Sequence, residues 1–268
     1  MGNTYDGEGA ADELPVHEVY VSAFYMNQYL VTWDLWYEVY TWALDNEYDF
    51  DNPGFGKAAD HPVQDVSWYD VVKWCNARSE KERRVPAYYV DPSHSTVYRT
   101  GQLDVESAWV KWDAGYRLPT EAEWEKAARG GLDGNRFPWG DTIDQSQANY
   151  RSSSTYAYDI NPTQGYHPEF QADGLPYTSP VSYFMPNDYG LYDMAGNLSE
   201  WCWDWKSDTY YSQSPHLNPR GPASGMSRVI RNGGWLSPAF SCRTSYRNQA
   251  WPEAAAYFGF RSVLAPGH

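Results

Sequence analysis

Three stretches of the chain carry hydrophobic residues at the spacing of an amphipathic helix. Thr32 is placed to cap the first, which runs to Leu44. Ser67 is placed to cap the second, in which apolar side chains recur at positions 68, 71, 72 and 75. Thr120 opens a capping box for the third, and Gly130 is placed to end it. The pattern therefore predicts three short helices, each with one buried face.

Strand-like patterns lie between and around these helices. Residues 18–26 alternate between polar and apolar side chains, which is typical of a half-buried strand. Residues 86–115 favour a hairpin followed by a loose strand. Near the C-terminus, the apolar run 228–231 precedes a Gly-Gly pair, and residues 258–264 form a second apolar run. This last pattern predicts a strand, a tight turn, an irregular loop and another strand.

The 268-residue chain is unusually aromatic and acidic. It contains 14 Trp and 24 Tyr residues, so its core must provide hydrogen-bond partners for many ring N–H and O–H groups. A formal net charge of −15 argues against nucleic acid and anionic membranes as partners. No apolar run is long enough to cross a membrane, and residues 1–13 lack the pattern of a signal peptide, so we expect a soluble protein without membrane insertion.

The C-terminal segment, residues 228–264, differs from the rest because its side chains follow no regular period. Arg243, Arg247 and Arg261 are spaced along it as anchors, and the residues between them are mostly small or aromatic. Fixed anchor residues, with irregularly spaced side chains between them, are typical of a binding surface. The sequence shows no internal repeat and no linker, so we interpret residues 1–268 as a single domain that contains this segment.

The same segment carries a recognisable pattern of residues. R-V-x-R-x-G-G-W begins at Arg228, C-R-x-x-Y-R-N begins at Cys242, and G-F-R begins at Gly259. With the predicted helix 120–130, this pattern resembles the formylglycine-generating-enzyme, or sulfatase-modifying factor, family. The resemblance implies an α+β fold, a variant of the C-type lectin fold with much irregular structure, short antiparallel sheets and a few helices. That family contains enzymes, and also non-enzymatic diversity-generating retroelement variable proteins, whose C-terminal segment displays variable ligand-binding residues.

The resemblance also implies one or two structural calcium ions, held by oxygen ligands. The first site would use side-chain oxygens of Asp193 and Glu200 and main-chain oxygens of Gly196 and Leu198. The second site would use Asn149 and Asp173 with the main-chain oxygens of Tyr150 and Leu175. Turn and cap hydrogen bonds made by the same residues are the alternative.

Resemblance to the enzyme members of this family would imply a copper site made by two cysteines five residues apart, since copper(I) prefers soft thiolate ligands. Here Pro238 lies at about the position of the first cysteine, and only Cys242 is present in the segment. The resemblance without this cysteine pair predicts a protein that is not an enzyme and has no catalytic residues. A copper-dependent cysteine oxidase, or another catalytic relative, is the alternative.

The resemblance to variable proteins also predicts which residues bind a ligand. Adenine-directed mutation in such relatives never produces Gln, Glu, Lys, Met or Trp, so Gln249, Trp251 and Glu253 would be fixed. The permitted positions are Leu236, Ser237, Pro238, Ala239, Phe240, Ser241, Ala250, Ala254, Ala255, Ala256 and Tyr257. We expect them to bind a protein or cell-surface ligand, with affinity mainly from rings such as Phe240 and Tyr257. The alternative is an ordinary loop of a paralogue, whereas a variable segment would place the protein on a virion or a cell surface.

Overall fold

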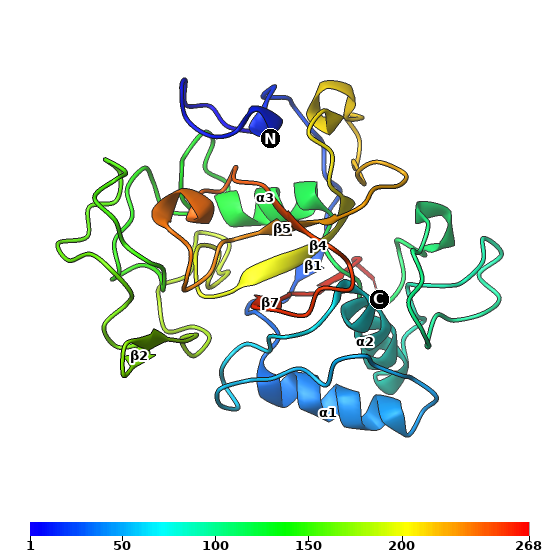
Figure 1. Ribbon diagram of the computed structural model, residues 1–268. Coiled ribbons are helices and arrows are strands. Elements are labelled where there is room, and N and C mark those ends of the chain that lie inside the picture. The colour runs from blue at the N-terminus through cyan, green and yellow to red at the C-terminus, as the bar shows by residue number, and fades with distance from the viewer. Residues whose placement is uncertain (268) are drawn as a thin grey trace.

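The computed structural model describes residues 1–267, as short elements joined by long irregular segments (Figure 1). The α-helices are α1 (Trp33–Leu44), α2 (Trp68–Lys81) and α3 (Glu121–Arg129). The strands are β1 (Tyr25–Met26), β2 (Gln171–Ala172), β3 (Leu175–Pro176), β4 (Ser199–Trp205), β5 (Arg228–Arg231), β6 (Asn248–Ala250), β7 (Phe258–Gly259) and β8 (Val263–Leu264). The 3₁₀ turns are η1 (Ala11–Glu13), η2 (Ser107–Trp109), η3 (Tyr210–Gln213) and η4 (Ala239–Cys242).

A four-stranded sheet in the order β6-β5-β4-β7 lies at the centre of the molecule (Figure 1). β5 pairs antiparallel with β4 and with β6, whereas β7 runs parallel to β4. Most pairings are antiparallel, as expected, and the parallel pairing of β7 with β4 is the exception in this sheet. The connection after β6 carries the chain across the sheet to the far edge, so β7 arrives in the same direction as β4. The C-terminal segment thus supplies three of the four strands of this sheet.

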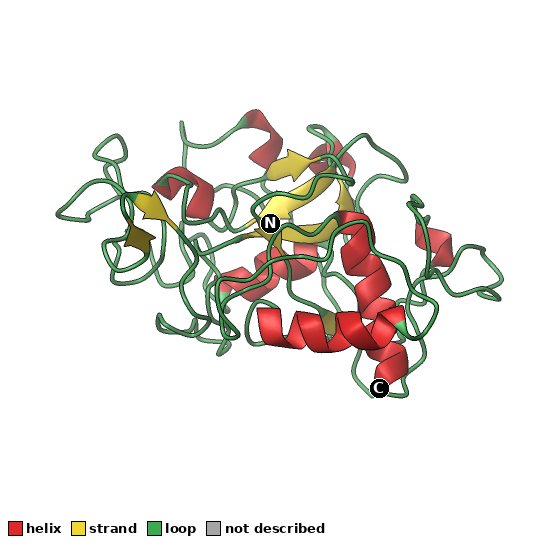
Figure 2. Cartoon of the chain, turned by 60° about the horizontal axis from the view of Figure 1, so that its bottom comes forward, coloured by secondary structure: helices red, strands yellow, loops and turns green. Residues whose placement is uncertain are grey.

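The helices form where their caps and apolar spacing predicted them. Thr32 accepts a hydrogen bond from the main-chain N–H of Leu35 at 3.3 Å, and Ser67 and Thr120 form the caps of α2 and α3. Gly130 ends α3 with φ +58°, a left-handed conformation that suits glycine. α3 packs against β4 and β5, and Figure 2 shows α1 crossing α2 on another side of the sheet. Among the described residues, no helix is both long and apolar enough to cross a membrane.

The core is built largely from aromatic rings whose polar groups are satisfied. The buried rings of Trp36 and Trp74 stack with their centroids 5.7 Å apart and an interplanar angle of 5°. The ring N–H of Trp68 donates to the main-chain oxygen of Cys202, and that of Trp201 donates to Val66, both at 3.0 Å. These bonds confirm the prediction from composition that ring N–H groups need partners inside the protein.

Two predicted strand regions are less regular than their sequence patterns indicated. Of residues 18–26, Tyr25–Met26 forms β1, and Tyr20 makes an isolated bridge with Leu217. Residues 86–115 contain isolated bridges and η2 in place of a full hairpin. Residues 18–26 pair with distant segments at a few residues, and the bridges of residues 86–115 join single residues within that stretch, so neither region forms a long strand ladder.

Candidate functional site

Buried arginine side chains hold the C-terminal segment to the rest of the protein. Nε and Nη2 of Arg261 donate to the two carboxylate oxygens of Glu200 at 2.8 and 2.9 Å. Arg243 makes the same two-point contact with Glu13, at 2.8 and 2.7 Å. These four side chains are 0–2% exposed. Because a bidentate pair sets direction as well as distance, each arginine fixes the course of the main chain around it.

A third anchor is centred on Glu121, the first residue of α3. Nε and Nη2 of Arg247 donate to its two carboxylate oxygens at 2.7 and 2.8 Å, and Nη1 of Arg231 donates to one of them at 2.7 Å. Burial would raise the pKa of Glu121, but the guanidinium groups of Arg247 and Arg231 lower it below its usual value. The carboxylate is therefore charged. Through Arg231 and Arg247 it links α3 to β5 and to the residue just before β6.

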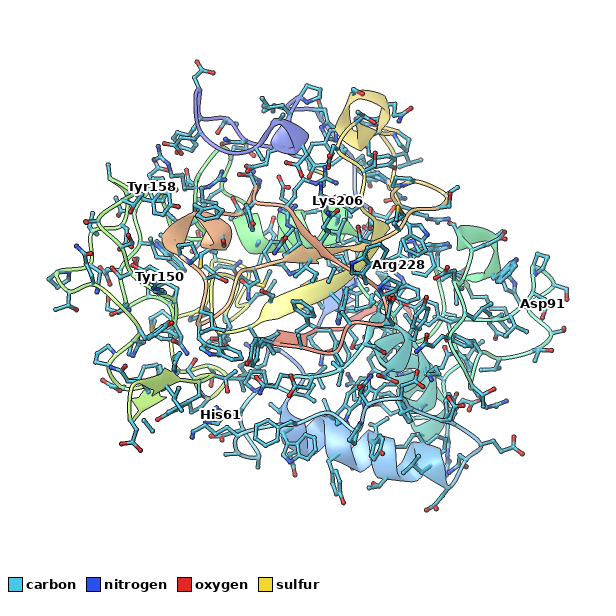
Figure 3. All side chains as sticks on the ribbon, in the orientation of Figure 1. His61, Asp91, Tyr150, Tyr158, Lys206 and Arg228 are labelled. Atoms are coloured by element: carbon cyan, nitrogen blue, oxygen red, sulfur yellow. The ribbon has the colours of Figure 1, made fainter. Side chains whose placement is uncertain are left out.

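Arg228, the first residue of β5, lies between aromatic rings rather than beside a carboxylate. Its guanidinium carbon is 3.4 Å from the ring centroid of Trp205 and 3.7 Å from that of Trp68. Nη1 donates to the main-chain oxygen of Trp203 at 2.8 Å. Burial lowers the pKa of Arg228 to about 9. Figure 3 shows this side chain on the central sheet, where it stabilises the start of the C-terminal segment by stacking.

The N-terminal residues take part in this frame, which the sequence did not indicate. η1 places Glu13 beside Arg243, 230 positions along the chain. The main-chain oxygen of Asp12 accepts from Nη1 of Arg247 at 2.8 Å. An acidic run at an N-terminus usually lies in solvent, and its sequence contains no pattern that distinguishes a buried carboxylate from an exposed one.

The predicted ligand-binding residues differ widely in exposure. Leu236 and Tyr257 expose 39% and 54% of their surface, and Ala255 is also exposed. Partial exposure is shared by Ser237, Pro238, Phe240, Ala250, Ala254 and Ala256. Ala239 and Ser241 are buried, because η4 turns them inward, so the structure does not support them as ligand contacts. Trp251, which the mutation rule would hold fixed, exposes 54% of its surface.

The main chain beneath these exposed residues is held by hydrogen bonds to other parts of the fold. The oxygen of Ala256 accepts from the N–H of Asp65 at 2.8 Å, and that of Ser237 accepts from Arg151 at 2.9 Å. The ring of Tyr257 packs edge-on against buried Trp235, with centroids 5.2 Å apart. The loops are thus ordered before any ligand arrives, so binding need not include the cost of ordering them.

Comparison with known proteins shows the family. The Sulfatase-modifying factor enzyme 1-like domain matches residues 1–266. The chain belongs to this family. The formylglycine-generating enzyme of Streptomyces coelicolor is 36% identical over 264 residues, which are 93% of this chain and 78% of that protein. The enzyme of the same name from Thermomonospora curvata is 41% identical over 184 residues, which are 65% of this chain and 57% of that protein.

Among solved structures, Treponema denticola variable protein 1 is similar, with a TM-score of 0.69 and 31% identity. The match covers 92% of this chain and 86% of that one. The fold is therefore the one that the sequence resemblance implied, the formylglycine-generating-enzyme type of the C-type lectin fold. The chain is thus similar both to proteins named as formylglycine-generating enzymes and to a protein named as a variable protein.

The prediction that this family member is not an enzyme is contradicted. The relatives from Streptomyces and Thermomonospora are named formylglycine-generating enzyme at 36% and 41% identity. The earlier prediction rested on one missing cysteine, whereas identity over most of the chain points to a catalytic family. Catalysis is therefore a candidate function of this protein.

The cysteines of this family member nevertheless do not fit a bis-thiolate copper site. Counting five residues back from Cys242 reaches Ser237, not Pro238, and Oγ of Ser237 accepts from the N–H of Gly234 at 3.0 Å. Burial raises the pKa of the Cys242 thiol above its usual value. Cys75 and Cys202 are buried in two other clusters of the core. Cys242 alone therefore cannot form a copper site of two thiolates.

The first calcium set lies together in the turn before β4, around a residue that the sequence did not single out. Nδ2 of Asn232 donates to the main-chain oxygens of Asp193, Gly196 and Leu198 at 2.9, 2.7 and 3.0 Å. Its Oδ1 is buried without a hydrogen-bond partner among the described residues. Burial raises the pKa of the Asp193 carboxyl to about 6. In contrast, both carboxylate oxygens of Glu200 accept hydrogen bonds from Arg261.

The second calcium set falls in two different surroundings. Asn149 and Tyr150 are buried, and the main-chain oxygen of Tyr150 accepts from Nε2 of Gln145 at 2.9 Å. Asp173 and Leu175 are exposed at the β2–β3 turn, where Asp173 has φ +54°. Calcium at this set stays a prediction from resemblance.

Proposed function

We propose that this protein binds another protein or a cell-surface molecule through the exposed side chains of its C-terminal segment. Leu236 and Tyr257 are large apolar side chains exposed in this segment, and Trp251 is another exposed ring of the segment. Exposed aromatic and aliphatic groups on a rigid support are typical of binding hot spots. We further propose that the exposed residues vary between copies of the gene, as in a diversity-generating retroelement variable protein.

The observation that carries this proposal is the contrast between the buried anchor arginines of the C-terminal segment and the exposed side chains between them. Every predicted anchor arginine is buried in a two-point ion pair, while the side chains between the anchors include exposed positions of no regular period. Substitution of an exposed side chain would leave those ion pairs unchanged. The likeness to Treponema denticola variable protein 1 supports the same interpretation.

A second candidate function is catalysis, which the identity to formylglycine-generating enzymes favours. A catalytic member would act on a cysteine-containing peptide bound along the same segment. The chain has one cysteine there, Cys242, so such activity would use a ligand set different from two thiolates.

The test is deep sequencing of the gene region that encodes residues 228–264 across a natural population. We expect substitutions at exposed positions such as Leu236 and Tyr257, with Arg243, Arg247 and Arg261 unchanged. A uniform segment would reject the variable part of the proposal. Conversion of a cysteine peptide to an aldehyde by the purified protein would instead establish the catalytic function.

Calcium is proposed as a structural cofactor at the Asp193 turn. A cation could replace Nδ2 of Asn232 among the three main-chain oxygens if the amide turned its unpartnered Oδ1 inward, because hard cations prefer such oxygens. It would also neutralise the buried Asp193.

We therefore expect calcium removal to destabilise the protein. At a free calcium concentration ~100 times the dissociation constant, the loss would be ~2.7 kcal/mol, which lowers Tm by roughly 5–10 °C. Thermal unfolding in EGTA, with and without excess calcium, measures this difference. Magnesium in place of calcium is the control, and equal Tm values in EGTA and calcium would contradict the site.

A further inference from the structure

A separate cavity of about 450 Å³ opens beside η4, away from the exposed loop 250–257. Rings of Tyr156, Tyr158, Phe240 and Tyr246 line it, together with Arg243. The N-terminal residues 7–10 form the opposite wall. Figure 3 shows Tyr158 on the outer loop that flanks η4, close to the N-terminal residues. The cavity therefore combines three parts of the chain that are distant in sequence.

The ring of Phe240 stands at steep angles to Tyr246 and Tyr156, whereas Tyr156 and Tyr158 are stacked, with an interplanar angle of 16°. Phe240 and Tyr246 are perpendicular, with an interplanar angle of 90° and centroids 5.1 Å apart. Tyr156 is tilted by 49° from Phe240, with centroids 5.5 Å apart. Rings arranged as the walls of a corner can contact a compact group from more than one side, whereas a planar nucleobase would stack on one ring face only. The geometry is that of an aromatic cage.

The carboxylates that line the cavity, Glu8 and Glu13, are both paired. Glu13 is paired with Arg243, which also lines the cavity, and Glu8 is paired with Arg136. A further carboxylate, Asp141, accepts from the main-chain N–H of Arg136 at 3.2 Å and lies outside the lining residues. Because both guanidinium groups already bind carboxylates, they offer little to an anionic ligand. The acidic balance of the whole chain, −15, would also attract a cation.

Rings in this corner already hold a cation from the protein itself. The guanidinium carbon of Arg136 is 3.6 Å from the ring centroid of Tyr5 and 5.1 Å from that of Tyr158. The face of Tyr158 is thus partly occupied, and Tyr156 stacks on Tyr158 with ring centroids 5.5 Å apart. Phe240 contacts both Tyr156 and Tyr246, and these three rings line the cavity. The same ring chemistry is therefore available to a cation that enters from solvent.

We propose that this cavity binds a quaternary ammonium group, such as the trimethylammonium head of choline or phosphocholine. The methyl groups would contact the rings of Tyr156, Phe240 and Tyr246, and the positive charge would interact with the ring faces and the nearby carboxylates. This ligand class goes beyond the proposed function. Residue 240 belongs both to the cage and to the predicted variable positions, so in a segment that varies, the residue at this position would decide whether the cage is complete.

The experiment is a calorimetric titration of the full chain with choline and with 3,3-dimethyl-1-butanol, its uncharged analogue of the same shape. We expect choline to bind at least about tenfold more tightly, because only the cation interacts with the ring quadrupoles. A parallel titration with phosphocholine distinguishes a free cation from a headgroup. Equal affinity for choline and the neutral analogue, or no binding of choline, would overturn the proposal.

Variants locate the binding within the cage. Phe240→Ala is expected to weaken choline binding about tenfold, and Tyr246→Phe to retain it, because the ring and not the hydroxyl contacts the ligand. Tyr25→Ala, at a ring that is 64% exposed on β1, is the control and should bind as the wild type does. Circular dichroism confirms that each variant is folded. Unchanged affinity in folded Phe240→Ala would show that choline binds elsewhere.

Discussion

Replacing Glu121 with Gln is expected to lower the free energy of unfolding by about 3–5 kcal/mol, since removing one partner of a buried ion pair leaves the other charge uncompensated. Two guanidinium groups, from Arg231 and Arg247, share this carboxylate. Arg231 retains Glu125 at 3.1 Å, whereas Arg247 loses its only carboxylate partner among the described residues. Urea unfolding followed by tryptophan fluorescence measures the difference.

The control for this change is Glu38→Gln on α1. Glu38 pairs with Lys81 at the surface, and its side chain is 60% exposed. An exposed pair contributes about 0–1 kcal/mol, so the control should unfold nearly as the wild type does. Equal effects of the two substitutions would contradict the interpretation of Glu121 as a buried anchor. Retained choline binding in folded Glu121→Gln would show that the cage forms without this anchor.

Replacing Arg261 with Met is expected to have a similarly large effect, about 3–5 kcal/mol, because it leaves the carboxylate of Glu200 buried without its cation. Both side chains are 0% exposed. The same arginine donates from Nη2 to the main-chain oxygen of Tyr192 at 3.0 Å, so the turn before β4 also loses a contact. Chemical denaturation of the purified variant measures the loss.

A second substitution separates charge from packing at this pair. In Arg261→Met with Glu200→Gln, the side chain at position 200 is neutral but can still accept the hydrogen bond that Trp124 donates at 3.1 Å. The double variant should therefore recover part of the stability lost by Arg261→Met alone. If the double variant is less stable than the single one, an uncompensated Glu200 charge is not the cause of the loss.

Local signals in the sequence were sufficient to predict the helices and the strands at the ends of the C-terminal segment. Thr32, Ser67 and Thr120 cap helices within three residues of themselves, so each cap is visible without knowledge of the fold. The apolar run 228–231 became β5 because its hydrophobic residues favour a buried strand wherever the chain places it. The regular spacing of motifs was also enough to indicate the family, which the match over residues 1–266 confirms.

Partnerships between distant residues were decided by the tertiary structure. The sequence marked Arg243, Arg247 and Arg261 as anchors, but their carboxylates lie 230, 126 and 61 positions away. Many acidic side chains could have satisfied those arginines, because charge alone does not specify a partner. Only the path of the chain selects one carboxylate for each arginine.

Burial and ring geometry around η4 depended on the tertiary structure in the same way. Ala239 and Leu236 were predicted alike as ligand contacts, yet Ala239 in η4 is buried and Leu236 is exposed. The cage formed by Tyr156, Phe240 and Tyr246 joins two segments that share no sequence pattern. The sequence by itself therefore determined the family, the helices and which arginines act as anchors, since each is visible from residues close in the chain. The tertiary structure decided which surfaces a ligand can reach, because exposure depends on how separate segments pack.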